Sequence, residues 1–326
     1  MKTILTAAIA AAVVLGSAPP ASAVPETELR PAALERGEDV VIPHLEGETV
    51  VDGDIRIEVN AGSVRFLGTS GSDYVVGAAN KDGDGAFRAL RFTAEGEKTV
   101  LFRDVPIYEL ELADDGTQIA SPRYRRQETR VRVFSAVDGT VQATARFNGS
   151  VSVLDLDAGR MLLGGWSPNR TFLWDIEPGT TAKLVGRPGY EADISADRLA
   201  TLTKDPYLGG CSIVSTVFSP RERLWRSCEH RVDSFSPGGR RAATIHILSD
   251  GIGPGDVWLR RSGGKVLAHY SAEWFGLLSW ESDQSLLLDT NGKRKSATVR
   301  CLVDDCERAS DLRPSPDLRV TPPGGP

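Results

Sequence analysis

Five carboxylates hold the same kind of position relative to short turns, and together they could bind a cation or move protons. Each lies two, four or six residues before one of the turn residues Asp115, Asp157 and Asp197. Side chains alternate between the two faces of a strand, so an even offset gives each carboxylate the same direction within its strand. Converging carboxylates can bind a cation or a basic ligand, or raise one another's pKa enough for acid and base chemistry. The five residues are Glu109, Glu111, Asp155, Glu191 and Asp193.

The same carboxylates also have a purely structural interpretation. Half-buried carboxylates commonly accept hydrogen bonds from Arg side chains or from backbone N–H groups of neighbouring sheets. That structural role is the more common one for such carboxylates, whereas ligand binding is the more specific hypothesis. Which of the two applies depends on whether the strands that carry these residues come together.

The turns that follow the carboxylates recur along the chain at a nearly constant spacing. Successive turn residues are 42, 42, 40, 41 and 45 positions apart, and short alternating or apolar segments flank each turn. A period of about 40–45 residues with several short strands per unit is typical of a β-propeller, in which small four-stranded sheets surround a channel. The recurring turn residues are Asp73, Asp115, Asp157, Asp197, Gly238 and Asp283.

Six turn residues do not fix the number of sheets, or blades, at six. Residues 40–45, the Glu46-Gly47 turn and residues 49–51 resemble the outer hairpin of one more unit, which residues 55–59 extend. A period of about 42 residues also divides the chain after residue 23 into close to seven units. We predict an all-β propeller of seven antiparallel blades, one of them partial and built mainly by the N-terminal segment. Six blades are the alternative.

Two short motifs resemble those of known propellers. Phe235-Ser236-Pro237-Gly238-Gly239-Arg240 and Leu173-Trp174-Asp175 resemble the strand-turn and strand-end motifs of WD-repeat and TolB-type β-propellers. The resemblance covers roughly residues 64–312. Because only one unit has Trp-Asp and none has the Gly-His pair of a full WD repeat, the resemblance is to a divergent member. In WD-type propellers the strand before the turn is innermost, so the resemblance implies that the five carboxylates line the channel.

The ends of the chain differ in composition from the repeats. Lys2, the apolar segment 4–15 and Ala21-Ser22-Ala23 form the pattern of a secretory signal peptide. We therefore expect a protein that is secreted, periplasmic or held at the cell surface, with no membrane span. The predicted divisions are a signal peptide (1–23), an N-terminal lead segment (24–37), the propeller (38–312) and a disordered tail rich in Pro and Gly (313–326).

The four cysteines fit an oxidising compartment, where two disulfides are the default. Cys211 and Cys228 lie equally far from the Ser219-Pro220 turn, and Cys301 and Cys306 straddle Val303-Asp304. Directly opposed residues of a hairpin are close enough for a disulfide. We predict the pairs 211–228 and 301–306 over a metal site, because both pairs lack the C-x-x-C spacing.

Other metal, cofactor and catalytic signals are weak. Residues 80–85 match the first half of a calcium loop, but Arg91 stands where a bidentate Glu is needed, so we expect a polar hairpin tip there. His44, His230, His246 and His269 are interpreted as scattered over different units. The chain has no H-E-x-x-H, G-x-S-x-G or Walker sequence. We expect no metal and no cofactor.

The charge balance argues against nucleic acid as a partner. Lys and Arg number 38 against 44 Asp and Glu, for a net charge of −6. The densest basic stretch is broken by Gln127 and Glu128, and we interpret it as a solvated surface where a loop enters a strand rather than as a polyanion site. That stretch contains Arg123, Arg125, Arg126, Arg130 and Arg132.

These observations favour a binding role over catalysis. The leading hypothesis is an exported, monomeric, non-enzymatic propeller that binds a protein or a component of the cell envelope. The alternative is an extracellular hydrolase or lyase that uses the acidic channel. Function on a propeller resides in sites added to a common scaffold, so the fold alone does not decide between them.

Overall fold

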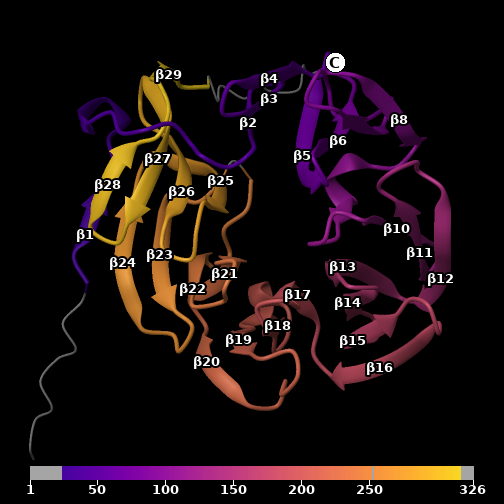
Figure 1. The fold of residues 1–326 in the computed structure, drawn as a ribbon. Coiled ribbons are helices and arrows are strands. Elements are labelled where there is room, and N and C mark those ends of the chain that lie inside the picture. Colours follow the sequence, from indigo (N-terminus) through magenta and orange to yellow (C-terminus); the bar gives the residue numbers. More distant parts are fainter. Residues whose placement is uncertain (1–23, 252, 317–326) are drawn as a thin grey trace, which may run out of the picture.

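Seven small sheets form a ring in the computed structural model, which describes residues 24–251 and 253–316 (Figure 1). The all-β, seven-bladed propeller predicted from the turn spacing is confirmed. The predicted partial blade is also present, as a three-stranded sheet formed by residues 44–58. Within the described part of the chain the helices are three single 3-10 turns, and none is long and apolar enough to cross a membrane.

The seven blades follow one another in chain order. Blade 1 comprises β2 (His44–Glu46), β3 (Thr49–Asp52) and β4 (Ile55–Glu58); blade 2 β5 (Ser63–Ser70), β6 (Asp73–Ala79), β7 (Arg88–Phe92) and β8 (Lys98–Arg103); blade 3 β9 (Glu111–Leu112), β10 (Gln118–Arg125), β11 (Glu128–Ser135) and β12 (Val141–Asn148); blade 4 β13 (Ser150–Asp157), β14 (Arg160–Trp166), β15 (Arg170–Asp175) and β16 (Thr180–Val185); blade 5 β17 (Gly189–Asp193), β18 (Arg198–Leu202), β19 (Ser212–Ser215) and β20 (Arg223–Ser227); blade 6 β21 (His230–Phe235), β22 (Arg241–His246), β23 (Asp256–Arg261) and β24 (Val266–Ser271); blade 7 β25 (Trp274–Trp280), β26 (Leu286–Asn291), β27 (Lys295–Leu302) and β28 (Asp305–Arg308). Outside the blades lie β1 (Glu26–Glu28), η1 (Pro31–Ala33), η2 (Ile107–Glu109), η3 (Pro206–Leu208) and β29 (Arg313–Pro314).

Each of blades 2–7 is a meander that starts at the centre of the ring and proceeds outward (Figure 1). The recurring turn residues lie where the first strand leads into the second. Asp115 and Asp197, for example, stand between β9 and β10 and between β17 and β18. The strand before each turn is therefore innermost, as the resemblance to WD-type propellers implied.

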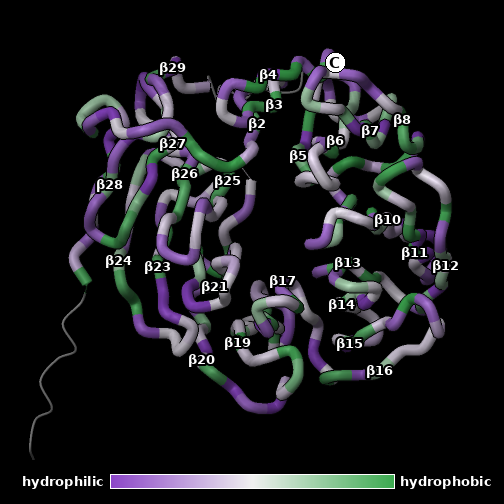
Figure 2. The backbone as a smooth tube through the Cα atoms, in the orientation of Figure 1, coloured by the Kyte–Doolittle hydropathy of each residue, from purple (hydrophilic) through white to green (hydrophobic). Residues whose placement is uncertain are grey.

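The apolar core lies between adjacent blades, and Figure 2 shows hydrophobic positions recurring in every blade. On β14, Met161 and Leu163 face the core shared with blade 3, whereas Leu162 faces the core shared with blade 5. A strand buried on both faces needs consecutive apolar residues, which explains this unbroken run. Full burial of each such side chain stabilises the fold by about 1.5–3 kcal/mol.

The inner strands share an irregularity near their middle. In β5, β13, β17 and β21 the pairing register shifts by one residue, leaving Leu67, Leu154, Tyr190 and Asp233 as the extra residues. In β25 the register shifts between Phe275 and Leu278. A bulge of this kind bends the strand and redirects its side chains. The simple two-residue alternation therefore fails at one point in each of these strands.

The N-terminal segment runs across the outside of the last two blades. β1 pairs in parallel with β24. Before the chain enters blade 1, the backbone of Arg36 pairs in parallel with the backbone of Arg308 in blade 7. We call residues 24–40 the N-terminal strap. The predicted lead segment, residues 24–37, is thus hydrogen-bonded to the blades. The predicted signal peptide lies outside the described residues.

The first residues of the predicted C-terminal tail are hydrogen-bonded to blade 7. Arg313 and Pro314 form β29 on β27, and the Ser315 N–H donates to the carbonyl of Arg294. Pro314 fits because it occupies a strand of only two residues at the end of the sheet. Residues 317–326 lie outside the described residues.

A buried ion pair fastens the N-terminal strap to blade 7. The Arg300 guanidinium donates to both carboxylate oxygens of Glu281 at 2.6 and 2.7 Å, and only 11% and 8% of the two side chains are exposed. Arg300 also donates to the carbonyls of Glu38 and Asp39 at 3.1 and 2.9 Å, and the Val41 N–H donates to Glu281 at 3.0 Å. One ion pair therefore holds three backbone groups of the chain that leads into blade 1.

Both predicted disulfides are present. Cys211 is bonded to Cys228, and Cys301 to Cys306. Cys301 and Cys306 are direct partners in the pairing of β27 with β28. For the first pair, Ser212 and Ser227 are paired one step further into the β19–β20 hairpin. The hairpin register thus confirms the predicted connectivity.

The two disulfides should differ in how much they stabilise the protein. In the chain-entropy model, closing the 17-residue separation between Cys211 and Cys228 contributes about 3 kcal/mol, and the 5-residue separation between Cys301 and Cys306 roughly 2 kcal/mol. We expect the 211/228 double Ser variant to lose more stability in urea titrations than the 301/306 double Ser variant. Peptide mapping without reductant should recover the two pairs, and crossed pairing would contradict the register.

Removing one partner of the Arg300–Glu281 pair should strongly destabilise the ring. Glu281→Gln removes the more buried of the two carboxylates that pair with the Arg300 guanidinium, and Glu307 remains at 2.8 Å. The cost should therefore lie near the lower end of the about 3–5 kcal/mol that is typical when a buried ion pair is broken. The matched control is Glu273→Gln, because the exposed Glu273–Lys293 pair should contribute less than about 1 kcal/mol. Equal losses in urea titrations of the two variants would contradict this role.

The pH dependence of the same variant gives an independent check. Burial alone would raise the pKa of Glu281, but the hydrogen bonds from Arg300 and the Val41 N–H outweigh burial and lower it. A lowered folded-state pKa stabilises the protein above the unfolded-state value of about 4.3, and that stability is lost as pH falls further. Glu281→Gln should therefore lose less stability than the parent protein between pH 5 and pH 3.

Candidate ligand-binding site at the central axis

Four of the five predicted carboxylates lie on innermost strands of three consecutive blades. Glu111 is on β9, Asp155 on β13, and Glu191 and Asp193 are on β17. The fifth, Glu109, is exposed in the 3-10 turn η2. Its even offset misleads because β9 has only two residues, so the strand alternation does not extend back to position 109.

Two further acidic residues that the sequence analysis missed belong to the same region. Asp233 is the extra residue of the bulge in β21, and its negative charge acts on Glu191. It lies five residues before Gly238, an odd offset that the alternation rule assigns to the other face. Asp114 lies in the turn after β9, next to Asp115. We call these six residues the axial carboxylates: Glu111, Asp114, Asp155, Glu191, Asp193 and Asp233.

Three axial carboxylates from three blades lie close together. One oxygen each of Asp114, Asp155 and Asp193 lies within 4.8 Å of the other two. Burial raises the pKa of Asp155 to about 7, with the charges of Asp114 and Asp193 adding to the shift. Burial, followed by the charge of Asp193, also raises the pKa of Asp114. Near neutral pH this group therefore contains a carboxyl that can gain or lose a proton.

The remaining three axial carboxylates form a second group with two arginines. Burial raises the pKa of Glu191 well above its usual range, and the charges of Asp233 and Glu111 act in the same direction. Burial also raises the pKa of Asp233, against the opposing charge of Arg231. Arg65 of β5 lies 3.6 Å from Glu111. Arg65 is thus the neighbour of Glu111, and Arg231 is the neighbour of Glu191 and Asp233.

Asp155 also has a structural role. One of its oxygens accepts from the Leu156 N–H at 2.7 Å, and the other accepts from the Ile194 N–H of blade 5. This hydrogen bond joins two blades near the centre of the ring. The structural interpretation therefore applies to Asp155, while Glu191 and Asp233 accept no side-chain hydrogen bond from another described residue.

The chemistry available at this site is that of oxygen ligands and titrating carboxyl groups. Asp114, Asp155 and Asp193 could hold a hard cation such as Ca²⁺, which prefers carboxylate and carbonyl oxygens. The partial calcium loop at residues 80–85 is different. There the Asn80 side chain accepts from the Asp84 and Gly85 N–H groups and donates to the Asp84 carboxylate, so the loop satisfies its own polar groups.

The interpretation that the histidines are scattered over different units is wrong for three of them. His230, His246 and His269 lie on β21, β22 and β24 of blade 6, and His230 and His246 are direct cross-strand partners. The Trp258 ring lies between His230 and His269, with ring centroids 4.0 and 4.7 Å away. Because an indole separates these two imidazoles, they are placed for stacking rather than for shared metal binding.

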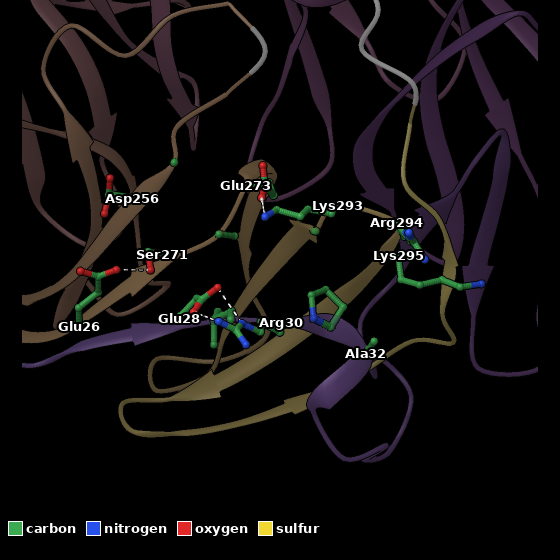
Figure 3. Close-up of a pocket in the computed structure, with 15 residues that line it drawn as sticks. Glu26, Glu28, Arg30, Ala32, Asp256, Ser271, Glu273, Lys293, Arg294 and Lys295 are labelled. Carbon is green, nitrogen blue, oxygen red and sulfur yellow. Dashed lines mark hydrogen bonds and ion pairs between the residues drawn. The ribbon is translucent and has the colours of Figure 1, made fainter.

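A large surface cavity lies away from the axial carboxylates, beneath the N-terminal strap (Figure 3). Its volume is about 960 Å³. Charged groups of both signs line it, and several are paired with each other: Arg30 with Glu28, and Lys293 with Glu273. The cavity therefore has no excess of one charge that would select a ligand.

Comparison with known proteins shows the fold and no close relative. No protein family model and no curated protein matches the sequence. Among solved structures, the β-propeller domain of the Trilobed protease from Pyrococcus furiosus has a TM-score of 0.59 at 10% identity, covering 83% of this chain and 89% of that one. The acylaminoacyl peptidase of Pyrococcus horikoshii has a TM-score of 0.58 at 10% identity, covering 81% of this chain and 47% of that one.

TolB from Acinetobacter baumannii is also similar, with a TM-score of 0.50 at 13% identity over 73% of this chain and 62% of that one. Identities this low establish the shape of the scaffold and leave the function open. The ring of seven meander sheets and these similarities together identify the chain as a divergent seven-bladed β-propeller.

Proposed function

We propose that this protein is an exported, non-enzymatic binding propeller whose axial carboxylates accept a cationic group of a protein or cell-envelope partner. The observation that carries the proposal is the gathering of six carboxylates from four consecutive blades, three of which have an arginine neighbour. Burial raises the pKa values of Glu111, Asp114, Asp155 and Glu191, and the charges of neighbouring carboxylates add to the shift, so a positive group would relieve that repulsion. Glu109 is not part of this proposed site, because it lies on η2.

Export is supported by the cysteines. All four are joined in disulfides, which form and persist in oxidising compartments. The signal-peptide pattern of residues 1–23 agrees with this location. We also propose that the protein is a monomer.

One observation favours hydrolase or lyase chemistry as a second candidate function. Asp155, with a pKa of about 7, can be protonated beside the carboxyl groups of Asp114 and Asp193, and neighbouring carboxyl groups that exchange a proton near neutral pH are used for acid and base catalysis. This candidate requires turnover on a panel of glycans and peptides that is lost in Glu111→Gln or Asp193→Asn while the fold is retained. Unchanged turnover in both variants would exclude the carboxylates as catalysts.

Binding of a cationic probe should strengthen as pH rises. Hexalysine should bind more tightly at pH 8 than at pH 5.5, because Asp155, with a pKa of about 7, loses its proton over this range. Isothermal titration calorimetry measures the change, which we expect to be about tenfold or more, the effect of about one charge-assisted contact. Hexaglutamate serves as the matched probe of opposite charge.

Variants locate the binding. The double variant Glu191→Gln/Asp193→Asn should weaken hexalysine binding at pH 8 by about tenfold or more. The control variant Glu95→Gln/Glu97→Gln removes the same charge from an exposed turn of blade 2 and should bind like the parent. Equal weakening in both variants would show a general charge effect and contradict the axial site.

The stability of the ligand-free protein should decrease as pH rises toward 7. Asp155 holds its proton more tightly in the folded state than in the unfolded state, so the folded state loses relative stability between about pH 4 and pH 7. For this one group the change is up to about 4 kcal/mol. Asp155→Asn should flatten the dependence measured in urea titrations, whereas an unchanged slope would contradict the raised pKa.

A further inference from the structure

Arginines from three adjacent strands of blade 3 lie directly opposite one another. Arg123 of β10 is paired with Arg130 of β11, which in turn is paired with Arg146 of β12. Arg132 lies two residues from Arg130 and so shares its face of the sheet. We call Arg123, Arg130, Arg132 and Arg146 the arginine row. Arg123, Arg130 and Arg146 are exposed, and Arg132 is half-buried.

This arrangement corrects the sequence interpretation of the basic stretch. The stretch is a hairpin of two eight-residue strands rather than a loop entering a strand, and its alternation places Arg123, Arg130 and Arg132 on one face. Cross-strand neighbours on one face lie about 4.5–5.5 Å apart at Cβ, so the positive charges are concentrated. The sequence pattern alone does not show the contribution of Arg146, which follows from the register of β12.

The positive charge of the row is largely unneutralised. Arg146 forms an ion pair with Glu128 at 3.1 Å. Within the described residues, Arg123 and Arg130 form neither an ion pair nor a side-chain hydrogen bond. Burial lowers the pKa of the Arg132 guanidinium, and the charges of Arg130 and Arg123 lower it further. The strand register and the lack of ion pairs at Arg123 and Arg130 thus leave like charges side by side on this face.

Such a row weakens the sheet, because like charges that are directly opposed are destabilising. The hairpin tip is also strained: Arg126 and Gln127 both have positive φ angles, 49° and 76°, where Asn-Gly is the favoured sequence. The chain as a whole is acidic, so this cluster of arginines does not reflect a generally basic composition. The opposed charges and the strained turn both destabilise this one hairpin. Local destabilisation of this kind is characteristic of a surface that is maintained for binding.

Arg132 is held in a fixed position on this surface. Its guanidinium lies over the ring of Phe134 at 4.9 Å, and Phe134 stacks on Phe102 of blade 2 with ring centroids 4.0 Å apart. A fixed guanidinium loses less conformational entropy when it binds a ligand than a free side chain does. Arg123 and Arg130 stand beside it without competing partners.

We propose that the arginine row binds a flexible phosphate polymer that carries no bases. Several guanidiniums can donate to one phosphate group at the same time, and their planar geometry suits its oxygens. A polymer supplies successive phosphates to the adjacent strands, which are about 4.8 Å apart. Binding through stacked bases is disfavoured, because Phe134 is buried on this face and the exposed Tyr124 belongs to the opposite face, opposite Thr129.

Binding of long-chain inorganic polyphosphate to the full chain tests the proposal, with fluorescence anisotropy measured over a range of salt concentrations. We expect Arg123→Gln/Arg130→Gln to weaken binding by about 100-fold, since each charge-assisted contact is typically worth about tenfold or more. The slope of log affinity against log salt should decrease by about two, one for each lost phosphate contact. The control Arg221→Gln/Arg223→Gln removes equal charge from exposed positions in blade 5 and should leave binding unchanged.

Three results would overturn the proposal. The first is no binding of polyphosphate by the parent protein at 150 mM salt. The second is equal weakening in the two double variants, which would indicate nonspecific attraction. The third is binding of a thymidine 20-mer as tightly as polyphosphate, which would identify a nucleic-acid surface.

Stability provides a readout that separates binding from misfolding. Removing two mutually repelling charges should leave Tm unchanged or raise it by about 1–2 °C in the Arg123→Gln/Arg130→Gln variant. Loss of binding with retained or increased Tm supports the proposal. Loss of both would assign the arginines a structural role and contradict it.

Discussion

One buried ion pair holds the last blade of the ring to the chain that enters its first blade. Arg300 and Glu281 belong to blade 7, yet their remaining hydrogen-bonding groups bind the backbone at Glu38, Asp39 and Val41. Among residues 24–251 and 253–316, no strand of blade 7 comes from the N-terminal part and no strand of blade 1 comes from the C-terminal part. The ring is therefore closed by side chains and by the strap. In a propeller whose closing blade combines strands from both ends of the chain, backbone hydrogen bonds between those strands would do this instead. The buried charges are tolerated because each is paired and hydrogen-bonded.

Polar bonds between neighbouring blades recur around the rest of the ring, and they explain why structure and candidate site overlap. Asp155 accepts from the Ile194 N–H, Asp283 accepts from the Gly238 N–H, and the Tyr190 hydroxyl accepts from the Val232 N–H, each across a blade boundary. The bulges contribute by redirecting side chains in the inner strands, Tyr190 and Asp233 among them. Asp155 thus joins two blades and is also one of the axial carboxylates.

The turn spacing was enough to predict a propeller, since each blade repeats one strand-turn-strand unit and the turn residues are local features. The seventh blade followed from the hairpin pattern around Glu46-Gly47 and from the length of the chain. Disulfide pairing was predictable for the same reason, because hairpin register follows from the position of the turn. The two-residue alternation located Asp155, Glu191 and Asp193, which lie between a bulge and the turn. It failed at Asp233, inside a bulge, and at Glu109, beyond the end of a two-residue strand. The strap depends on the pairing of β1 with β24, and the place of Arg146 in the arginine row depends on the pairing of β12 with β11. No local sequence pattern encodes either pairing.

The position of β1 has a consequence for how the chain reaches its native state. Glu26–Glu28 are among the first of the described residues to be synthesised, but their partners, His269–Ser271, are made more than two hundred residues later. Blades can form one by one from local contacts, whereas the strap must wait for blades 6 and 7. Contacts of such long sequence separation form slowly, because the entropy of closing the loop is lost before the contact is gained. Ring closure is therefore the last step of assembly, and until it occurs the outer edge of β24 stays open to strands of other chains.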